Sequence, residues 1–388
     1  MSRKCKDWLD TYLAYTDNSE PPTLFKIWCG ISAICSALQR KCWMEWDTYT
    51  YPNMYIVLVA PPGKGRKGTA MKPAQNLIAD LGIAQAPKSV SRSAMIKAMV
   101  NAKQETEIEG ENIVHNSLSV YSSELSVFLG KENYELIATL TMWFDCEPDW
   151  NYSTRLHGEE MVEGIWVNML GATTPEYLAS SLPQDAVGGG LTSRIIFVYG
   201  DRKSKICPTP FPTSEEVALY ETLIHDLERI LMLAGRFEYT GDWLDAHTEW
   251  YKASEEKPPF DEHPVLGKYV ERRSLHLRKL CMAMSASRSN ELVLRKVDFD
   301  RALSILLKTE QLMPYVFSGR GRASHSVVLA QVLKWLAQTG VLTLEDIIRR
   351  FKHDATQSEI LEIIRLLENG GYAEFNWRSK TLAYKDKR

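Results

Sequence analysis

The sequence predicts an α/β fold with a mostly parallel sheet, helices before and after it, and a small C-terminal unit. Three observations carry this prediction. An apolar run, Ile56–Val59, leads through a glycine- and lysine-rich turn into a helix-compatible stretch. Strand and helix patterns then alternate up to about residue 200, as in sheets whose strands are joined by helices. Helical periodicity dominates on both sides of that region.

The elements follow in order along the chain. Residues 5–46 carry apolar side chains at helical spacing, and Pro21-Pro22 divides them into two helices. Later strands are expected at 118–121, 165–174 and 194–199, and later helices at 91–100, 215–234, 240–253, 267–287 and 297–317. The predicted domains are an N-terminal helical segment (1–50), the α/β core (51–205), a helical domain (206–320) and a winged-helix domain (321–388).

Composition limits the class of protein. The chain has 388 residues, 45% hydrophobic and 24% charged, which is ordinary for a globular protein. Its net charge of −3 excludes a global basic field, so any contact with DNA requires local patches or a ring of subunits. The seven cysteines are scattered, which favours free thiols in a reducing cytosol. With no apolar run long enough for a membrane, we expect a cytoplasmic protein, in a bacterial host if phage-encoded.

The turn at 60–69 matches the phosphate-loop pattern G-x-x-x-x-G-K-[ST] imperfectly. Ala60 replaces the first glycine, the spacing is one residue longer, and Gly68 follows the lysine. Strand, glycine turn and helix are the context in which backbone amides wrap a phosphate. The alternative is a basic surface turn between a strand and a helix.

Three cations in this turn are candidates for the phosphate lysine. We expect Lys67 to reach the β- and γ-phosphates, with Arg66 and Lys64 as the other choices. Thr69 would supply a hydroxyl to Mg²⁺. The other turn residues expected to contact the nucleotide are Pro62, Gly63, Gly65 and Gly68.

Partner residues for nucleotide hydrolysis occur at the ends of later strands. Glu124 ends Tyr121-Ser122-Ser123-Glu124, where a carboxylate would orient water; the alternative is an acid in a helix first turn. Ser123 stands where an Mg²⁺-binding Asp is usual, and could act through a metal-bound water. Asn168 and Thr173 are the choices for a γ-phosphate sensor, with helix capping by Thr174-Pro175 as the alternative.

Arg194 follows the triple glycine at 188–190 and begins a strand. At a subunit edge, its guanidinium would stabilise charge on the γ-phosphate of a neighbouring subunit. The alternative is a surface arginine at a strand start.

The order of the segments 56–69, 121–124, 171–175 and 188–199 resembles a P-loop ATPase family of AAA+ type from phages and integrative elements, often helicase-like or primase-helicase-like. The resemblance covers roughly residues 5–315. It implies an AAA+-like core with a helical lid, and ATP and Mg²⁺ as cofactors. It also implies Lys67 as the phosphate lysine, Glu124 as the second-motif acid, Thr173 or Asn168 as sensor, and Arg194 as an arginine finger.

Two further segments suit a DNA motor. Residues 149–162 alternate around a glycine like a β-hairpin, and in related ring helicases a hairpin here projects into the channel. Arg155 and His157 would then contact phosphate, unless the hairpin packs on its own subunit. In the lid helix, Arg272 or Arg273 resembles a second nucleotide sensor, with a solvated basic face as the alternative.

The C-terminal unit has a winged-helix pattern of three helices and a two-stranded wing. Its third helix opens with the capping box Thr356–Glu359. The residues expected to contact duplex DNA are Gln357, Arg365, Arg378 and Lys380. Acidic residues on the third helix leave protein contact or subunit assembly as the alternative.

These features predict an ATP-driven hexameric ring that moves along single-stranded DNA, a replicative helicase of a phage or mobile element. The alternatives are a helicase loader or origin-binding initiator that recruits other replication proteins, and a weakly hydrolysing, nucleotide-gated scaffold.

Overall fold

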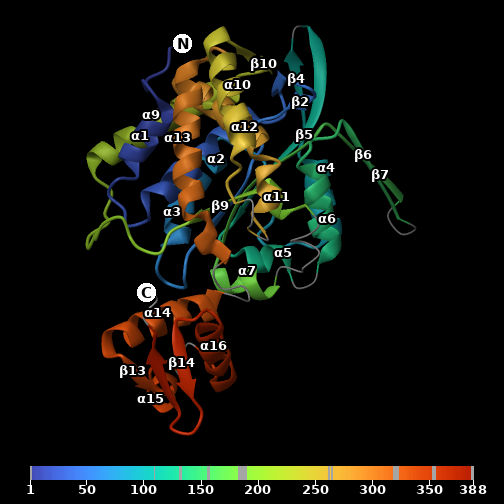
Figure 1. Cartoon of the computed structure of the whole chain (residues 1–388). Helices are drawn as coiled ribbons and strands as arrows, with labels where there is room; N and C mark the ends of the chain where they lie inside the picture. Colours follow the sequence, from blue (N-terminus) through green and yellow to red (C-terminus); the bar gives the residue numbers. More distant parts are fainter. Residues whose placement is uncertain are drawn as a thin grey trace. The chain divides into compact units, whose positions relative to one another are not determined.

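The computed structural model of the chain describes residues 2–108, 110–130, 133–154, 158–181, 190–260, 263, 265–317, 323–351 and 355–385. The chain divides into two compact units, Met1–Val316 and Phe317–Arg388 (Figure 1). The predicted segments 1–50 and 51–205, and nearly all of 206–320, therefore lie in one unit. Among the described residues, no helix is both long and apolar enough to cross a membrane.

The larger unit is built on a five-stranded sheet in the order β4-β5-β8-β3-β9. β5, β8, β3 and β9 are parallel neighbours, and β4 pairs antiparallel with β5. Every residue of β3 and β8 is buried, as expected of strands covered on both faces. The predicted, mostly parallel sheet is therefore present. Its strands are β3 (Tyr55–Val59), β4 (Lys103–Ile108), β5 (Glu111–Ser122), β8 (Ile165–Thr173) and β9 (Ile195–Tyr199).

Helices flank this sheet (Figure 1). They are α1 (Trp8–Tyr15), α2 (Thr23–Leu38), α3 (Lys67–Asp80), α4 (Arg92–Asn101), α5 (Leu125–Leu129), α6 (Tyr134–Trp143) and α7 (Pro175–Ser181), with a 3₁₀ turn η1 (Thr192–Arg194) before β9. The Asn168 side chain on β8 bonds to Ser32 and Ser36 on α2, whereas a Cβ on Gly171 would face Leu125 on α5. Because strand side chains alternate between faces, α2 and α5 cover opposite faces.

The remainder of the larger unit is mainly helical. It contains α9 (Ser214–Leu231), α10 (Gly241–Glu256), α11 (Gly267–Val270), α12 (Arg273–Arg288), α13 (Lys296–Leu312) and the 3₁₀ turn η2 (Met313–Phe317). The start of α9 is fixed by a capping box, in which the Thr213 hydroxyl accepts from the Glu216 amide and the Glu216 carboxylate accepts from the Thr213 amide.

Short strands correct two helix predictions. Residues 42–45 form a strand rather than the end of a helix, and the domain predicted as helical at 206–320 also contains short strands. These strands pair with partners far along the chain, which local periodicity does not reveal. They are β1 (Cys42–Glu45), which pairs with β2 (Tyr49–Thr50) and β10 (Gly235–Arg236), and β11 (Glu238–Tyr239), which pairs with β12 (Val293–Leu294).

The smaller unit has its own apolar core, which includes Val332, Ile347, Ile363 and Leu382. It contains α14 (Ala323–Thr339), β13 (Val341–Thr343), α15 (Leu344–Phe351), α16 (Gln357–Asn369), β14 (Ala373–Asn376) and β15 (Thr381–Tyr384). The strands form an antiparallel sheet in the order β13-β15-β14. The capping box predicted at Thr356 and Glu359 is confirmed.

Candidate functional site

The phosphate-loop candidate lies at the edge of the sheet where the parallel strands end. In the register of β3 and β8, Val59 is opposite Thr173, and the Ala60 amide donates to the Thr173 carbonyl at 3.4 Å. β5 ends at Ser122 on the same edge. Ligands of parallel α/β sheets bind at this edge. The structure thus brings together the turn and the segments that follow β5 and β8.

Close packing requires glycine at position 65. A Cβ on Gly65 would lie 2.5 Å from the Ala60 Cβ and 3.1 Å from the Gly200 carbonyl oxygen. Real Cβ atoms do not approach their neighbours so closely, because protein interiors are close-packed. In contrast, a Cβ on Gly68 would meet no described atom within 4 Å.

The turn is sharply folded at two further positions. Gly63 has a φ of +72° and Arg66 a φ of +49°, so both occupy the left-handed region. That region is natural for Gly63 and costs free energy at Arg66. The Lys64 amide donates to the Pro61 carbonyl at 3.2 Å, and Pro62 is exposed beside it. The backbone therefore turns sharply here, and the Lys64 amide is used within the turn.

Lys67 is the lysine that folds back over the turn. It begins α3, and its half-buried ammonium donates to the Ala60 carbonyl at 2.9 Å. Desolvation lowers the pKa of Lys67, and the negative charges of Glu124 and Glu176 partly oppose this effect. Lys67 therefore combines a desolvated cation with two nearby carboxylates.

The other two cations of the turn point elsewhere. The Arg66 Nε donates to Glu20 at 2.9 Å, and Lys203 donates to the same carboxylate at 2.7 Å. Lys64 is exposed. Of the three predicted choices for the phosphate lysine, the geometry favours Lys67.

Glu124 follows β5 directly and is exposed together with Ser123. It occupies the N-cap position of α5, but its side chain makes no capping hydrogen bond in the described chain. Helix capping therefore does not account for this carboxylate. Glu176, exposed in the first turn of α7, is a second acid at the same edge that is absent from the predicted site. The sequence feature that could have identified it is an acidic residue three positions after the end of a buried strand.

The two sensor candidates have different surroundings. Thr173 ends β8 beside the turn, and Thr174 caps α7 by accepting from the Tyr177 amide at 3.3 Å. Asn168 lies five positions earlier inside the sheet, where its Oδ1 accepts from the Met54 amide and its Nδ2 donates to the hydroxyls on α2. The assignment of Asn168 as a sensor is therefore corrected to a buried structural role, which leaves Thr173.

Arg194 lies at the opposite edge of the sheet from the turn. It directly precedes β9, and Ile195 pairs with Tyr55 at the start of β3. The five residues of β3, at about 3.3 Å each, separate this edge from Val59. Arg194 thus cannot reach the turn of its own chain, and its predicted role requires a neighbouring copy.

The Arg194 guanidinium is held by its own chain. Its Nη1 donates to the Gly190 carbonyl at 3.0 Å, and its Nη2 donates to Asp145. Arg272 donates to the other oxygen of the same carboxylate at 3.1 Å. An arginine finger at this position would first have to exchange Asp145 for a phosphate.

The assignment of Arg273 to nucleotide binding is also corrected. Its Nε and Nη2 donate to the buried Glu310 at 2.6 and 2.8 Å, and its Nη1 donates to Ser254. Its guanidinium also lies 5.0 Å from the centre of the Trp250 ring. Each of its three nitrogens thus has a partner within the helical part of the larger unit, and removing one partner of such a buried ion pair is strongly destabilising.

The residues of the turn fit a magnesium–triphosphate group. The Lys67, Gly68 and Thr69 amides open α3 and have no intrahelical acceptor, as at every helix start. Thr69 is exposed in the same turn. In the described parts of the chain, no three His, Cys, Asp or Glu side chains gather as a metal site. An Mg²⁺ ion carried by a triphosphate would find the Thr69 hydroxyl, phosphate oxygens and water as oxygen ligands.

The predicted DNA contacts are only partly described. β6 (Asp149–Thr154) and β7 (Gly158–Glu163) form the expected antiparallel hairpin, but Arg155 and His157 lie outside the described residues. In the smaller unit, the four predicted side chains are exposed: Gln357, Arg365, Arg378 and Lys380.

The comparisons with known proteins do not assign the chain to a family. No protein-family model matches the chain. A search of curated proteins finds no match. The resemblance to AAA+ ATPases therefore depends on the turn and on the residues that surround it.

Proposed function

We propose that the protein is an ATP-dependent motor that works on DNA as a hexameric ring, a replicative helicase of a phage or mobile element. The observation that carries this proposal is the meeting of Lys67 and Glu124 at one sheet edge, next to a helix start with free amides. Phosphoryl transfer needs little more than positioning and electrostatic stabilisation, and these groups supply both.

Each residue has a distinct role in this proposal. The free amides at the start of α3 and the Lys67 ammonium would hold the β- and γ-phosphates, and the Thr69 hydroxyl would be a ligand of the Mg²⁺ that ATP brings. Glu124 orients the attacking water and accepts its proton. Thr173 contacts the γ-phosphate side of the pocket, because β8 ends opposite the strand that carries the turn.

The position of Arg194 supports a shared site. The turn and Arg194 lie at opposite edges of one sheet, so a chain can offer its arginine only to a neighbour. In a ring of copies arranged head to tail, the turn of each subunit faces Arg194 of its neighbour at every interface. The exposed polar residues of the smaller unit and the β6–β7 hairpin are then available to DNA.

ATP hydrolysis tests the assignment of Lys67 and Glu124. We expect Lys67→Ala to abolish measurable hydrolysis, since it removes the cation over the phosphates. Glu124→Gln should keep ATP binding but reduce turnover about 10²-fold or more, the usual contribution of a general base. Lys72→Ala, an exposed change on the same helix, is the matched control. Normal turnover in Glu124→Gln would refute the role given to Glu124.

A helicase loader or initiator is the second candidate. The observation that favours it is Ser123, an exposed hydroxyl where an acid would hold Mg²⁺ more firmly. ATP-dependent displacement of a labelled DNA strand separates the two functions. A helicase displaces the strand by itself, whereas a loader hydrolyses ATP without displacement.

A further inference from the structure

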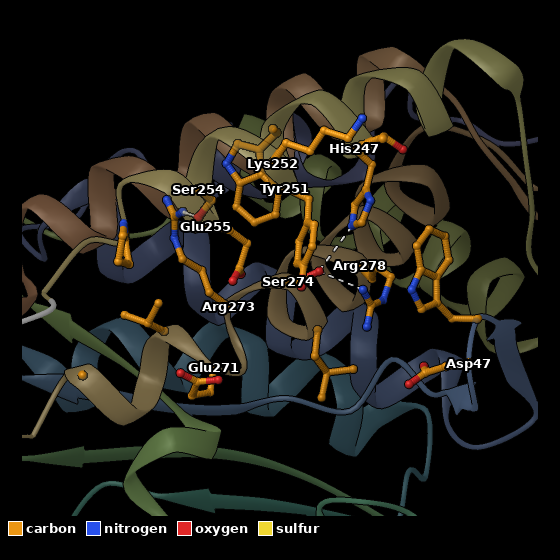
Figure 2. A pocket seen from close by; sticks show the side chains of 17 residues that line it. Asp47, His247, Tyr251, Lys252, Ser254, Glu255, Glu271, Arg273, Ser274 and Arg278 are labelled. Carbon is orange, nitrogen blue, oxygen red and sulfur yellow. Dashed lines mark hydrogen bonds between the residues drawn. The ribbon is translucent and has the colours of Figure 1, made fainter.

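A cavity of about 470 Å³ in the larger unit lies away from the phosphate loop. Its walls come from α10, from the α11–α12 segment and from the turn between β1 and β2 (Figure 2). That turn leads into β3, so the cavity adjoins the amino ends of the parallel strands, the edge opposite the phosphate loop. Its volume is in the range of sites that bind small molecules.

Aromatic side chains form one wall of the cavity. Trp46 and Trp250 are partly exposed there, and Tyr251 is 44% exposed. His247 lies between them, with its ring 4.9 Å from Trp46. Burial, helped by the charge of Arg278, lowers the pKa of His247 to about 4, so the ring is neutral at physiological pH. The Arg278 and Arg273 guanidinium groups lie 4.9 and 5.0 Å from the centres of the Trp46 and Trp250 rings, so the exposed Tyr251 ring offers the most open face for another ring to stack on.

Arg278 provides a cation with unused hydrogen-bonding capacity. The residue is only 9% exposed, and its Nη1 donates to Ser274 at 2.8 Å. Its buried Nε has no hydrogen-bond partner among the described residues. Because the Nε is enclosed by protein, a ligand would bind the guanidinium through its terminal nitrogens, of which only Nη1 has a hydrogen-bond partner among the described residues. In Arg273, by contrast, each of the three guanidinium nitrogens donates to Glu310 or Ser254.

The chemistry of the rim narrows the class of ligand. Asp47, Glu255 and Glu271 line the cavity and are exposed (Figure 2). These carboxylates disfavour a bare polyphosphate, and they accept hydrogen bonds from amino and hydroxyl groups. A nucleotide unit combines a flat ring, amino and hydroxyl donors, and a single phosphate, so it matches the aromatic wall, the acidic rim and Arg278 together.

Catalysis does not explain the polar cluster in this cavity. The Ser274 Oγ lies 3.4 Å from the His247 Nε2 and accepts from Arg278 (Figure 2). A histidine with a pKa of about 4 is a weak base, and general-base catalysis works best with a pKa near the operating pH. The cluster fits binding rather than activation of the serine hydroxyl.

A second cavity continues the first. It has a volume of about 650 Å³, is also lined by Asp47, Leu275 and Arg278, and adds Arg40, Arg272 and Lys279 to its walls. Asp145 and Glu147 line it as well, and Asp145 is paired with Arg272. The next phosphate of a strand that enters the first cavity would meet these additional cations.

We propose that the cavity between α10 and α12 is a second nucleotide-binding site, in which a base stacks on Tyr251 and is bordered by Trp46 and Trp250 while its phosphate binds Arg278. The nucleotide is either free or part of a single strand, since both present the same base and phosphate. The site is separate from the phosphate loop and does not depend on ATP hydrolysis there. Stacking on aromatic side chains tolerates any base.

Calorimetry on the full chain carrying Lys67→Ala tests this site without a contribution from the phosphate loop. The two probes are dAMP and a short oligodeoxyadenylate, which share base and sugar. We expect at least one of them to bind. Adding Arg278→Met or Tyr251→Ala should weaken that binding about tenfold, equivalent to about 1.4 kcal/mol. Arg202→Met, which removes an exposed arginine elsewhere, should leave the affinity within about twofold of its starting value.

The outcomes distinguish a free nucleotide from a nucleotide within a single strand. Binding of dAMP nearly as tight as that of the oligonucleotide supports a site for a free nucleotide. If the oligonucleotide binds much more tightly than dAMP, the result supports a strand that continues into the second cavity. If neither probe binds, or if both cavity variants bind as the parent does, the proposal is wrong. Tyr251 is exposed, so Tyr251→Ala keeps the test decisive even if Arg278→Met fails to fold.

Discussion

At the residue scale, the fold requires some glycines of the turn at 60–69 and not others. Gly63 supplies a left-handed backbone conformation, whereas Gly65 makes room for Ala60 and for the carbonyl of Gly200. Gly68 satisfies neither requirement, because a Cβ at this position points into open space. The pattern of glycines in the sequence therefore mixes positions that the fold requires with one that it does not.

These differences predict opposite effects of two alanine substitutions. Gly65→Ala should destabilise the chain by about 1–3 kcal/mol, the usual cost of overpacking. Gly68→Ala should be neutral or stabilising by up to about 1 kcal/mol, since alanine favours the first turn of α3 more than glycine does. Urea denaturation of both variants measures the difference. Equal destabilisation by the two substitutions would show that the loop is packed differently.

At the element scale, α12 carries charge into the interior of the larger unit. Lys279 is buried, donates to Asn53 and lies 4.1 Å from the centre of the Phe144 ring. Burial lowers the pKa of Lys279 to about 8 from an ordinary 10.5, and the charges of Cys146 and Asp145 partly oppose this effect. The charged form is therefore tolerated in the fold at a cost.

This burial predicts a pH-dependent stability that depends on one residue. Between about pH 8 and pH 10.5, the unfolded chain keeps the Lys279 proton while the folded chain has lost it, so stability from this group rises with pH. From about pH 8 to about pH 10, the free energy of unfolding of the wild type should rise by about 2–3 kcal/mol relative to that of Lys279→Met. Urea denaturation at both pH values measures it. A constant difference between the two proteins would contradict the assignment.

Several elements of the fold and site could be predicted from sequence because their signals are local. The apolar run at 56–59 became β3, the turn after it became the loop, and Lys67 and Glu124 came to one edge because parallel strands end together. β1 could not be predicted, since its partner β10 is far along the chain. β4 consists almost entirely of polar residues and has neither an apolar run nor an apolar–polar alternation, so its sequence did not predict a strand.

The roles of buried polar residues also depended on distant partners. Asn168 and Arg273 have the residue types of ligand-binding groups, and nothing nearby in the sequence identifies Ser32 or Glu310 as their partners. The same limit applies to Arg194, whose partner Asp145 precedes it by 49 residues. Trp46 and Arg278 come from separate segments, and only the folded chain brings them to one cavity.

At the scale of the whole molecule, the two edges of the central sheet carry complementary parts of one proposed site. The turn lies at the carboxyl edge and Arg194 at the amino edge. In the proposed ring, each subunit would give its arginine to one neighbour and receive an arginine from the other, so activity would depend on assembly.

Mixing two inactive variants tests this arrangement. Lys67→Ala keeps a working Arg194, and Arg194→Ala keeps a working loop, so a mixed ring contains some complete interfaces. We expect each variant alone to lack ATPase activity and the mixture to recover a measurable part of it. Gel filtration with ATP shows whether the mixture still assembles. Assembly without any recovery of activity would mean that each chain contains its whole site.

The most direct test of the account is calorimetric titration of the full chain with ATP and Mg²⁺. We predict binding at the phosphate loop that weakens strongly in Lys67→Ala and survives in Arg66→Ala, whose side chain is committed to Glu20. The absence of any heat of binding at millimolar ATP would contradict the account, and so would equal affinity in wild type and Lys67→Ala.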